Sequence, residues 1–98
     1  MEELEIEVID ENINLNITSK KKTHPYMTKF EYSKIVSFRV IQLMHGEPPK
    51  IKLDGFMDYR DIAIRELYQR VIPLRIKRIL PGGSTEIWNV TELNICNW

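Results

Sequence analysis

The sequence has one cysteine and no long apolar run, and both absences narrow the classes of protein that fit it. Cys96 alone cannot form an internal disulfide or a multi-cysteine zinc site. No apolar run approaches the roughly 18–20 residues that cross a bilayer. The acidic start, Met1-Glu2-Glu3, has the wrong charge for a secretion signal. We therefore expect an intracellular protein in a reducing compartment, with no membrane contact.

The sequence also lacks a recognisable set of catalytic or metal-binding residues. His24 and His45 stand near opposite ends of one predicted helix, so they cannot share a metal ion. Asp58 stands at a helix start, where capping explains a carboxylate without acid–base chemistry. Gly82-Gly83 is not followed by the Lys-Ser/Thr of a phosphate-binding loop. We expect no catalytic residue, no metal and no cofactor.

The net charge is zero, but the charges are unevenly placed along the chain. Residues 1–22 carry six acids against three lysines, whereas residues 23–80 carry eleven bases against six acids. An acidic arm therefore precedes a body of charge +5. This distribution favours a negatively charged partner, either protein or nucleic acid.

The acidic N-terminal arm, residues 1–24, alternates apolar and polar side chains. Leu4, Ile6 and Val8 are followed by Ile13, Leu15 and Ile17. Period-two alternation is typical of strands, here two short ones turning near residues 11–12. The acidic composition instead favours a disordered tail in the free protein. We prefer the disordered tail and keep the two strands as the alternative.

The first predicted helix runs from about Lys29 to His45. Thr28 and Glu31 fit a capping box at its start, and Gly46 ends it. Apolar residues surround the axis of its C-terminal half, which predicts a helix buried on nearly all sides. They are Ile35, Val36, Phe38, Val40, Ile41, Leu43 and Met44. One further helix and a hairpin cannot cover such a surface, so we expect a second chain to cover it.

The rest of the chain predicts a second helix and a β-hairpin. Ile51 and Leu53 suggest a brief extended piece, and Asp58 is the candidate N-cap of a helix over residues 59–70. Strands are predicted at residues 74–80 and 85–90, joined by a Pro-Gly-Gly-Ser turn. Alternation breaks at Arg78, which suggests a bulge or a charge directed at a partner. The fold class is small α+β: a two-helix domain over residues 25–98 with a C-terminal β-hairpin.

Arg39 is a cation inside the apolar helix, where it is costly unless paired. It could form a salt bridge to an acid within the domain, such as Glu66. It could instead bind carboxylates or carbonyls of a partner. The apolar residues on all sides of the helix favour the partner.

Several motifs resemble the omega-type small subunit of multisubunit DNA-dependent RNA polymerases, known as the sixth subunit in eukaryotes and subunit K in archaea. "PYMTKFEYSKIV" is similar to the family's Thr-Lys-aromatic-Glu helix start, and "FRVIQ" to its Arg-x-x-Gln signature. "DIAIREL" resembles the second-helix motif, and "VIPLRIKRILPGGSTEIW" the basic hairpin. Ser37 stands where the family usually has glycine. The acidic tail is shorter than in most nuclear versions, which suggests a viral or divergent polymerase.

The resemblance implies an omega-like, non-catalytic subunit that binds the largest polymerase subunit and promotes assembly. It would meet DNA only indirectly, through the complex, and the acidic arm could dock a transcription factor. It would reside in the nucleus if cellular and eukaryotic, or in the cytoplasm or virion if viral. The alternative is a free-standing nucleic-acid-binding module that uses the basic face. The predicted contacts with the largest subunit are Thr28, Lys29, Phe30, Glu31, Ile35, Phe38, Arg39, Gln42, Lys77 and Arg78.

Overall fold

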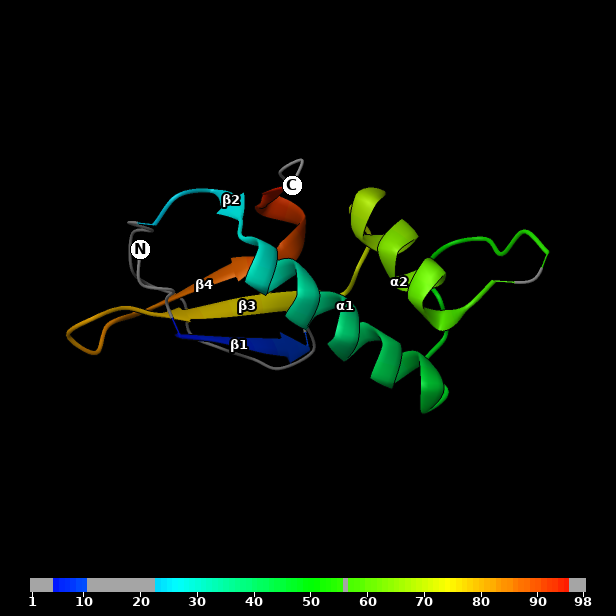
Figure 1. The fold of residues 1–98 in the computed structure, drawn as a ribbon, viewed down its shortest axis with the longest axis horizontal. Helices are drawn as coiled ribbons and strands as arrows, with labels where there is room; N and C mark the ends of the chain where they lie inside the picture. Colours follow the sequence, from blue (N-terminus) through cyan, green and yellow to red (C-terminus); the bar gives the residue numbers. More distant parts are fainter. Residues whose placement is uncertain (1–4, 11–22, 56, 96–98) are drawn as a thin grey trace.

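A computed structural model describes residues 5–10, 23–55 and 57–95. Two helices and five short strands make up the described chain (Figure 1). In chain order they are β1 (Glu5–Asp10), β2 (Tyr26–Met27), α1 (Lys29–Met44), α2 (Tyr59–Tyr68), β3 (Leu74–Ile79), β4 (Thr85–Asn89), the 3-10 turn η1 (Val90–Glu92) and β5 (Asn94–Ile95). The α+β class predicted from the sequence is confirmed.

The main sheet is antiparallel, with β3 between β1 and β4. Side chains of β3 alternate between buried and half-buried positions along the whole strand. The buried set, Leu74, Ile76 and Arg78, faces α1, and across the hairpin Ile76 pairs with Trp88. A second, parallel ladder joins β2 to β5 and fixes the chain just before α1.

The core lies where α1 packs on the sheet and on α2 (Figure 1). α1, α2 and β3 contribute most of its aliphatic residues, and Trp88 of β4 joins them. The core residues are Met27, Ile35, Val36, Leu43, Ile62, Ala63, Leu67, Ile72, Leu74, Ile76, Trp88, Val90 and Leu93.

The predicted helices are present, with differences at their ends. α1 spans Lys29–Met44, one residue shorter than predicted, because His45 is its C-cap. Gly46 follows with a φ of +98° that favours glycine. α2 ends at Tyr68, two residues before the predicted end. Asp58 occupies its N-cap position, but its side chain makes no capping hydrogen bond. Residues 51–53 form no strand, because they lie in a loop with no neighbouring strand to pair with.

The expectation of a disordered arm is wrong for residues 5–10. These residues form β1, which pairs with β3 from Glu5↔Ile79 to Asp10↔Leu74. Ile6 and Val8 lie opposite Arg78 and Ile76, so they face the side of the sheet that α1 covers. The strand is stable there because β3 satisfies its backbone groups and α1 shelters its apolar side chains. Cys96 and the turn expected near residues 11–12 lie outside the described residues.

The expected bulge at Arg78 is also absent. Pairing with β4 continues without interruption from Arg75↔Asn89 to Ile79↔Thr85. Arg78 therefore keeps the alternation and points inward, where it is 1% exposed. It is a buried charge within the chain rather than a charge directed at a partner.

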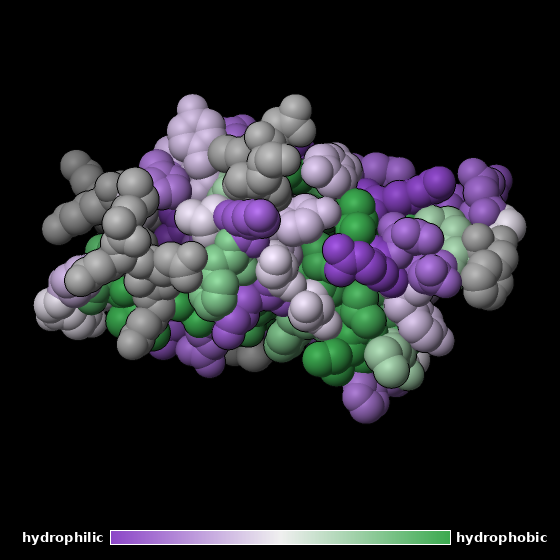
Figure 2. All heavy atoms as spheres, viewed as in Figure 1, coloured by the Kyte–Doolittle hydropathy of each residue, from purple (hydrophilic) through white to green (hydrophobic). Residues whose placement is uncertain are grey.

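The surface of α1 that faces away from the core remains partly apolar. Ile41 is 55% exposed and Met44 63% exposed, whereas a soluble helix usually presents polar residues there. Hydrophobic side chains are visible over the C-terminal half of α1 (Figure 2). The described chain thus covers one side of the helix and leaves the other uncovered.

Candidate docking surface on the first helix

The start of α1 is fixed by the predicted capping box. The Glu31 backbone N–H donates to Thr28 Oγ1 at 3.1 Å, and the Thr28 N–H donates to Glu31 Oε1 at 2.9 Å. Each residue thereby satisfies a donor that the first turn leaves without a helical acceptor. Thr28 and Glu31 therefore position the helix.

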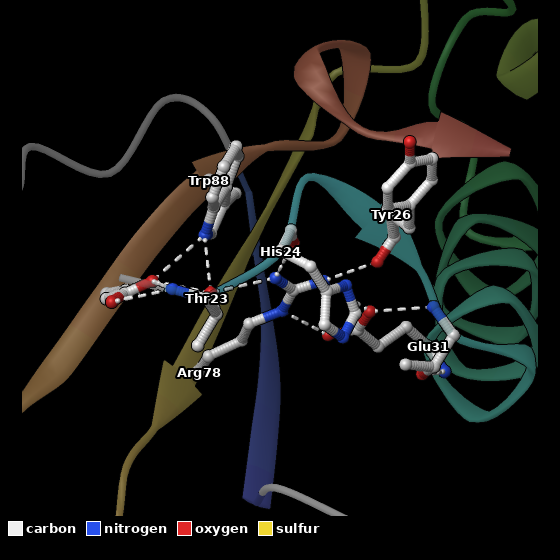
Figure 3. A network of polar contacts seen from close by, with 8 residues as sticks. Thr23, His24, Tyr26, Glu31, Arg78 and Trp88 are labelled. Carbon is white, nitrogen blue, oxygen red and sulfur yellow. Dashed lines mark hydrogen bonds and ion pairs between the residues drawn. The ribbon is translucent and has the colours of Figure 1, made fainter. Parts of the chain in front are cut away.

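Glu31 also forms a buried ion pair with Arg78 of β3 (Figure 3). Arg78 Nε donates to Glu31 Oε2 at 2.6 Å, and Nη2 donates to Glu31 Oε1 at 2.7 Å. The other guanidinium hydrogens reach the carbonyl oxygens of His24 at 2.7 Å and Tyr26 at 2.9 Å. One arginine thus ties together the sheet, the start of α1 and the segment that precedes it.

Thr23 extends this network toward the hairpin. Its hydroxyl donates to Glu86 Oε1 at 2.5 Å and accepts from Arg78 Nη1 at 2.9 Å. Trp88 Nε1 also reaches the Thr23 hydroxyl at 3.3 Å, and the Arg78 guanidinium lies 5.5 Å from the Trp88 ring centroid. Figure 3 shows these side chains converging from β3, β4 and the segment before β2.

The buried side chain of Arg39 is paired within the chain, which corrects our preference for a partner. Arg39 Nε donates to Glu66 Oε1 at 2.8 Å and Nη2 to Glu66 Oε2 at 2.9 Å. Nη2 also donates to the Pro48 carbonyl at 3.2 Å, and the Lys50 N–H donates to Glu66 Oε2 at 2.8 Å. Both side chains are 0% exposed. Glu66, the acid considered from the sequence, holds α1, α2 and the loop between them.

Gln42 connects this buried pair to β1. Arg39 Nη1 donates to Gln42 Oε1 at 3.0 Å, and Gln42 Nε2 donates to Asp10 Oδ2 at 2.8 Å. A continuous chain of polar contacts therefore runs from α2 through α1 to the last residue of β1. Gln42, predicted from the sequence to contact the largest subunit, makes both of these hydrogen bonds within the described chain.

The other predicted contacts separate into buried and exposed positions. Ile35 belongs to the core and is 0% exposed. Lys29 and Phe30 are exposed on the first turn of α1. Lys77 points away from α1, and its ammonium lies 4.0 Å from a carboxylate oxygen of Glu7.

A groove of about 520 Å³ lies between the outward side of α1 and β1. Phe30, Phe38 and Ile41 line its helical wall, and Ile6 and Val8 line the wall formed by β1. Its polar lining residues are Glu7 of β1 and, on α1, Lys34 and two serines, Ser33 and Ser37. Size and lining suit a short apolar segment of another molecule. We call these lining residues the α1–β1 groove.

Within residues 5–10, 23–55 and 57–95, no group of three or more His, Cys, Asp or Glu side chains could hold a metal ion. None of the helices in that part of the chain is long and apolar enough to span a membrane. The pKa of Tyr32 is raised above 10.0, mainly by burial and to a smaller extent by Tyr68. The positive charge of Arg60 acts in the opposite direction and lowers this pKa. Tyr32 is therefore neutral near pH 7, as an ordinary tyrosine is.

Sequence reasoning missed the part played by β1 and by the residues around Arg78. The alternation of β3 could have revealed the buried position of Arg78, because strict alternation from Leu74 places Arg78 on the inward face. The pattern of Ile6 and Val8 indicated a strand, but not the edge to which it would attach. That edge depends on contacts between distant segments of the chain.

No protein-family model matches the chain, but curated proteins do. A Caenorhabditis elegans protein, "Probable DNA-directed RNA polymerases I, II, and III subunit RPABC2", is 40% identical over 81 residues, covering 83% of this chain and 59% of the relative. The Schizosaccharomyces pombe RPABC2 subunit is 44% identical over 73 residues, covering 74% and 51%. "DNA-directed RNA polymerases II and V subunit 6B" of Arabidopsis thaliana is 42% identical over 73 residues, again covering 74% and 51%.

The printed names of these relatives all describe subunits of DNA-directed RNA polymerases. The chain belongs to their family, the RPABC2 or sixth-subunit family, which confirms the predicted resemblance. It spans only about half to three-fifths of the length of these relatives.

Proposed function

We propose that this protein is a non-catalytic subunit of a DNA-directed RNA polymerase that binds the largest subunit and promotes assembly. The observation that carries the proposal is the uncovered apolar side of α1 in a chain of this family. Phe30, Ile41 and Met44 are 37%, 55% and 63% exposed. Contiguous apolar surface on a small protein marks an interaction site.

The contact with the largest subunit is formed by outward side chains of α1. Phe30 and Phe38 lie in the α1–β1 groove, and Lys29, the residue before Phe30, is exposed. Glu31, Arg39 and Arg78 act differently from the sequence prediction: they hold α1 in place from inside. A large subunit therefore meets a helix that is already rigid on its inner side, so little ordering entropy is lost on binding.

Binding would promote assembly by mass action. A subunit that binds only the folded form of its partner stabilises it by RT ln(1 + [L]/Kd), which is about 2.7 kcal/mol at a hundredfold excess over Kd. No chemistry is required of the subunit itself. The protein would be found wherever that polymerase is assembled.

Replacing Ile41 with aspartate tests the proposal. Ile41 is more than half exposed, so the charge should leave the fold intact and disrupt only a partner's apolar contact. We expect recovery of Ile41→Asp with affinity-purified polymerase to fall at least about tenfold, the effect of about 1.4 kcal/mol of binding energy. Tyr59→Asp is the matched control, because Tyr59 is 49% exposed and lies on α2, outside the α1–β1 groove.

Two results would contradict the proposal: no polymerase recovered with the unmodified chain, or equal recovery of both variants. Arg39→Ala is unsuitable for this test. Arg39 is fully buried against Glu66, so its loss would lower stability and reduce recovery for that reason alone.

The alternative function is a free-standing nucleic-acid-binding module. The two buried ion pairs, Arg39–Glu66 and Arg78–Glu31, each remove one cation and one anion, so the body keeps its charge of +5. This alternative predicts an affinity of the isolated chain for DNA or RNA that falls steeply with salt. Negligible affinity at low salt would exclude it and leave the polymerase proposal untouched.

A further inference from the structure

We infer that β1, the strand formed by residues 5–10 of the acidic arm, is half of the docking site, so that the polymerase partner binds α1 and β1 together. The inference rests on the proposed function and deepens it. Without β1, the α1–β1 groove would have one wall: the helix alone, with no Ile6 and Val8 opposite Phe30 and Ile41. In this arrangement β1 supplies one wall of the docking site.

The position of β1 is set by the same contacts that hold α1. Its backbone pairs with β3 over six residues, and Asp10 accepts a hydrogen bond from Gln42 of α1. Gln42 in turn accepts from Arg39, which the Glu66 carboxylate fixes. The two walls of the groove are therefore held at a set separation by one polar chain, as a preformed docking site requires.

The lining also indicates the chemistry of the occupant. The walls are mainly aliphatic and aromatic, with Lys34 as the cation and Glu7 as the anion among them. The Glu7 carboxylate lies 4.0 Å from the ammonium of Lys77, on the far side of the groove from Lys34's helix. Its ammonium lies 5.2 Å from the Phe30 ring centroid, and among the described ion pairs none involves Lys34. A segment of the largest subunit with two or three aliphatic side chains and a neighbouring carboxylate complements this surface: the aliphatic groups fill the groove and the carboxylate meets Lys34.

Variants of the 98-residue chain distinguish this inference from the proposed function, when each is tested for recovery with affinity-purified polymerase. We expect Ile6→Asp to lower recovery at least about tenfold, as Ile41→Asp does, while Tyr59→Asp has no effect. Ile6→Thr keeps a β-branched side chain suited to a strand and only makes the wall polar. If Ile6→Asp fails to fold, Ile6→Thr still tests this wall of the groove. We expect recovery of Ile6→Thr with polymerase to fall about threefold or more. Circular dichroism of each variant reports whether the fold is kept.

Lys34 gives an independent readout of the occupant's charge. We expect Lys34→Glu to lower recovery and to abolish its dependence on salt, while Lys34→Arg retains both. Equal recovery of Lys34→Glu and Lys34→Arg would overturn the acidic occupant.

The inference about β1 fails if Ile6→Thr and Ile6→Asp enter the polymerase like the unmodified chain while Ile41→Asp does not. In that case α1 binds alone and the proposed function survives. It also fails if the Ile6 variants lose only a transcription factor, because the arm would then be a factor-docking segment. If the unmodified chain does not enter the polymerase, the proposed function fails first.

Discussion

Replacing Arg78 with alanine should destabilise this protein far more than replacing its neighbour Lys77, although both are cations on β3. Arg78 is 1% exposed, and its guanidinium supplies hydrogen bonds to Glu31, Thr23 and two backbone carbonyls. Its removal leaves the Glu31 carboxylate, 2% exposed, without its counter-charge. Breaking a buried pair in this way costs about 3–5 kcal/mol. That is a large share of the roughly 5–15 kcal/mol that stabilises a domain.

Lys77 provides the contrast. Its side chain is 35% exposed, and the Glu7 carboxylate oxygen lies at the limit of an ion pair, 4.0 Å away. Exposed pairs contribute about 0–1 kcal/mol. For a domain of this size, 1 kcal/mol shifts Tm by about 4–8 °C. We therefore expect Arg78→Ala to lower Tm by at least about 12 °C, and Lys77→Ala by no more than about 8 °C.

Thermal unfolding followed by circular dichroism measures both variants. A double variant, Arg78→Met with Glu31→Gln, removes both charges and keeps an amide oxygen that can accept from Thr28 at the helix start. It should recover much of the stability that Arg78→Ala loses, because neither charge of the Arg78–Glu31 pair is then left buried without its partner. The reasoning is refuted if Arg78→Ala and Lys77→Ala unfold at the same temperature, or if the double variant is no more stable than Arg78→Ala.

The remaining predictions concern the cap and the tyrosine. Thr28→Val removes the N-cap oxygen of α1 and should cost about 1 kcal/mol in thermal unfolding, whereas Thr28→Ser should cost little; equal losses would show that the cap does not hold the helix. Burial raises the pKa of Tyr32 above 10.0, so its favourable contribution is complete below pH 10 and is lost as pH rises through the higher folded value. Absorbance at 295 nm should show one late-ionising phenol that Tyr32→Phe removes, and an unchanged titration curve in that variant would contradict the assignment. The Arg78, Thr28 and Tyr32 variants test the fold, whereas the Ile41 and Ile6 variants test the docking site.

The features that the sequence predicted well are those that neighbouring residues decide. The capping box of Thr28 and Glu31, the stop at Gly46 and the Pro-Gly-Gly-Ser turn act within a few residues of chain. Local hydrogen bonds and backbone preferences are sufficient to place them, so α1 and the hairpin were found close to their observed bounds. The uncovered apolar surface of α1 was also predictable, because apolar residues surround the axis of its C-terminal half and a chain of this size cannot cover them all.

The partners of the buried charges and the place of the arm were decided only by tertiary structure. Arg39 meets Glu66 across 27 residues of chain, Arg78 meets Glu31 across 47, and Asp10 meets Gln42 across 32. Nothing local distinguishes an arginine that will find a carboxylate inside the fold from one that must find it on another chain. Likewise, alternation in residues 5–10 indicated a strand but gave no information on which edge would accept it. Packing of α1 on the sheet brings these groups together, and the cost of leaving a charge or a backbone donor unpaired in the interior determines the outcome.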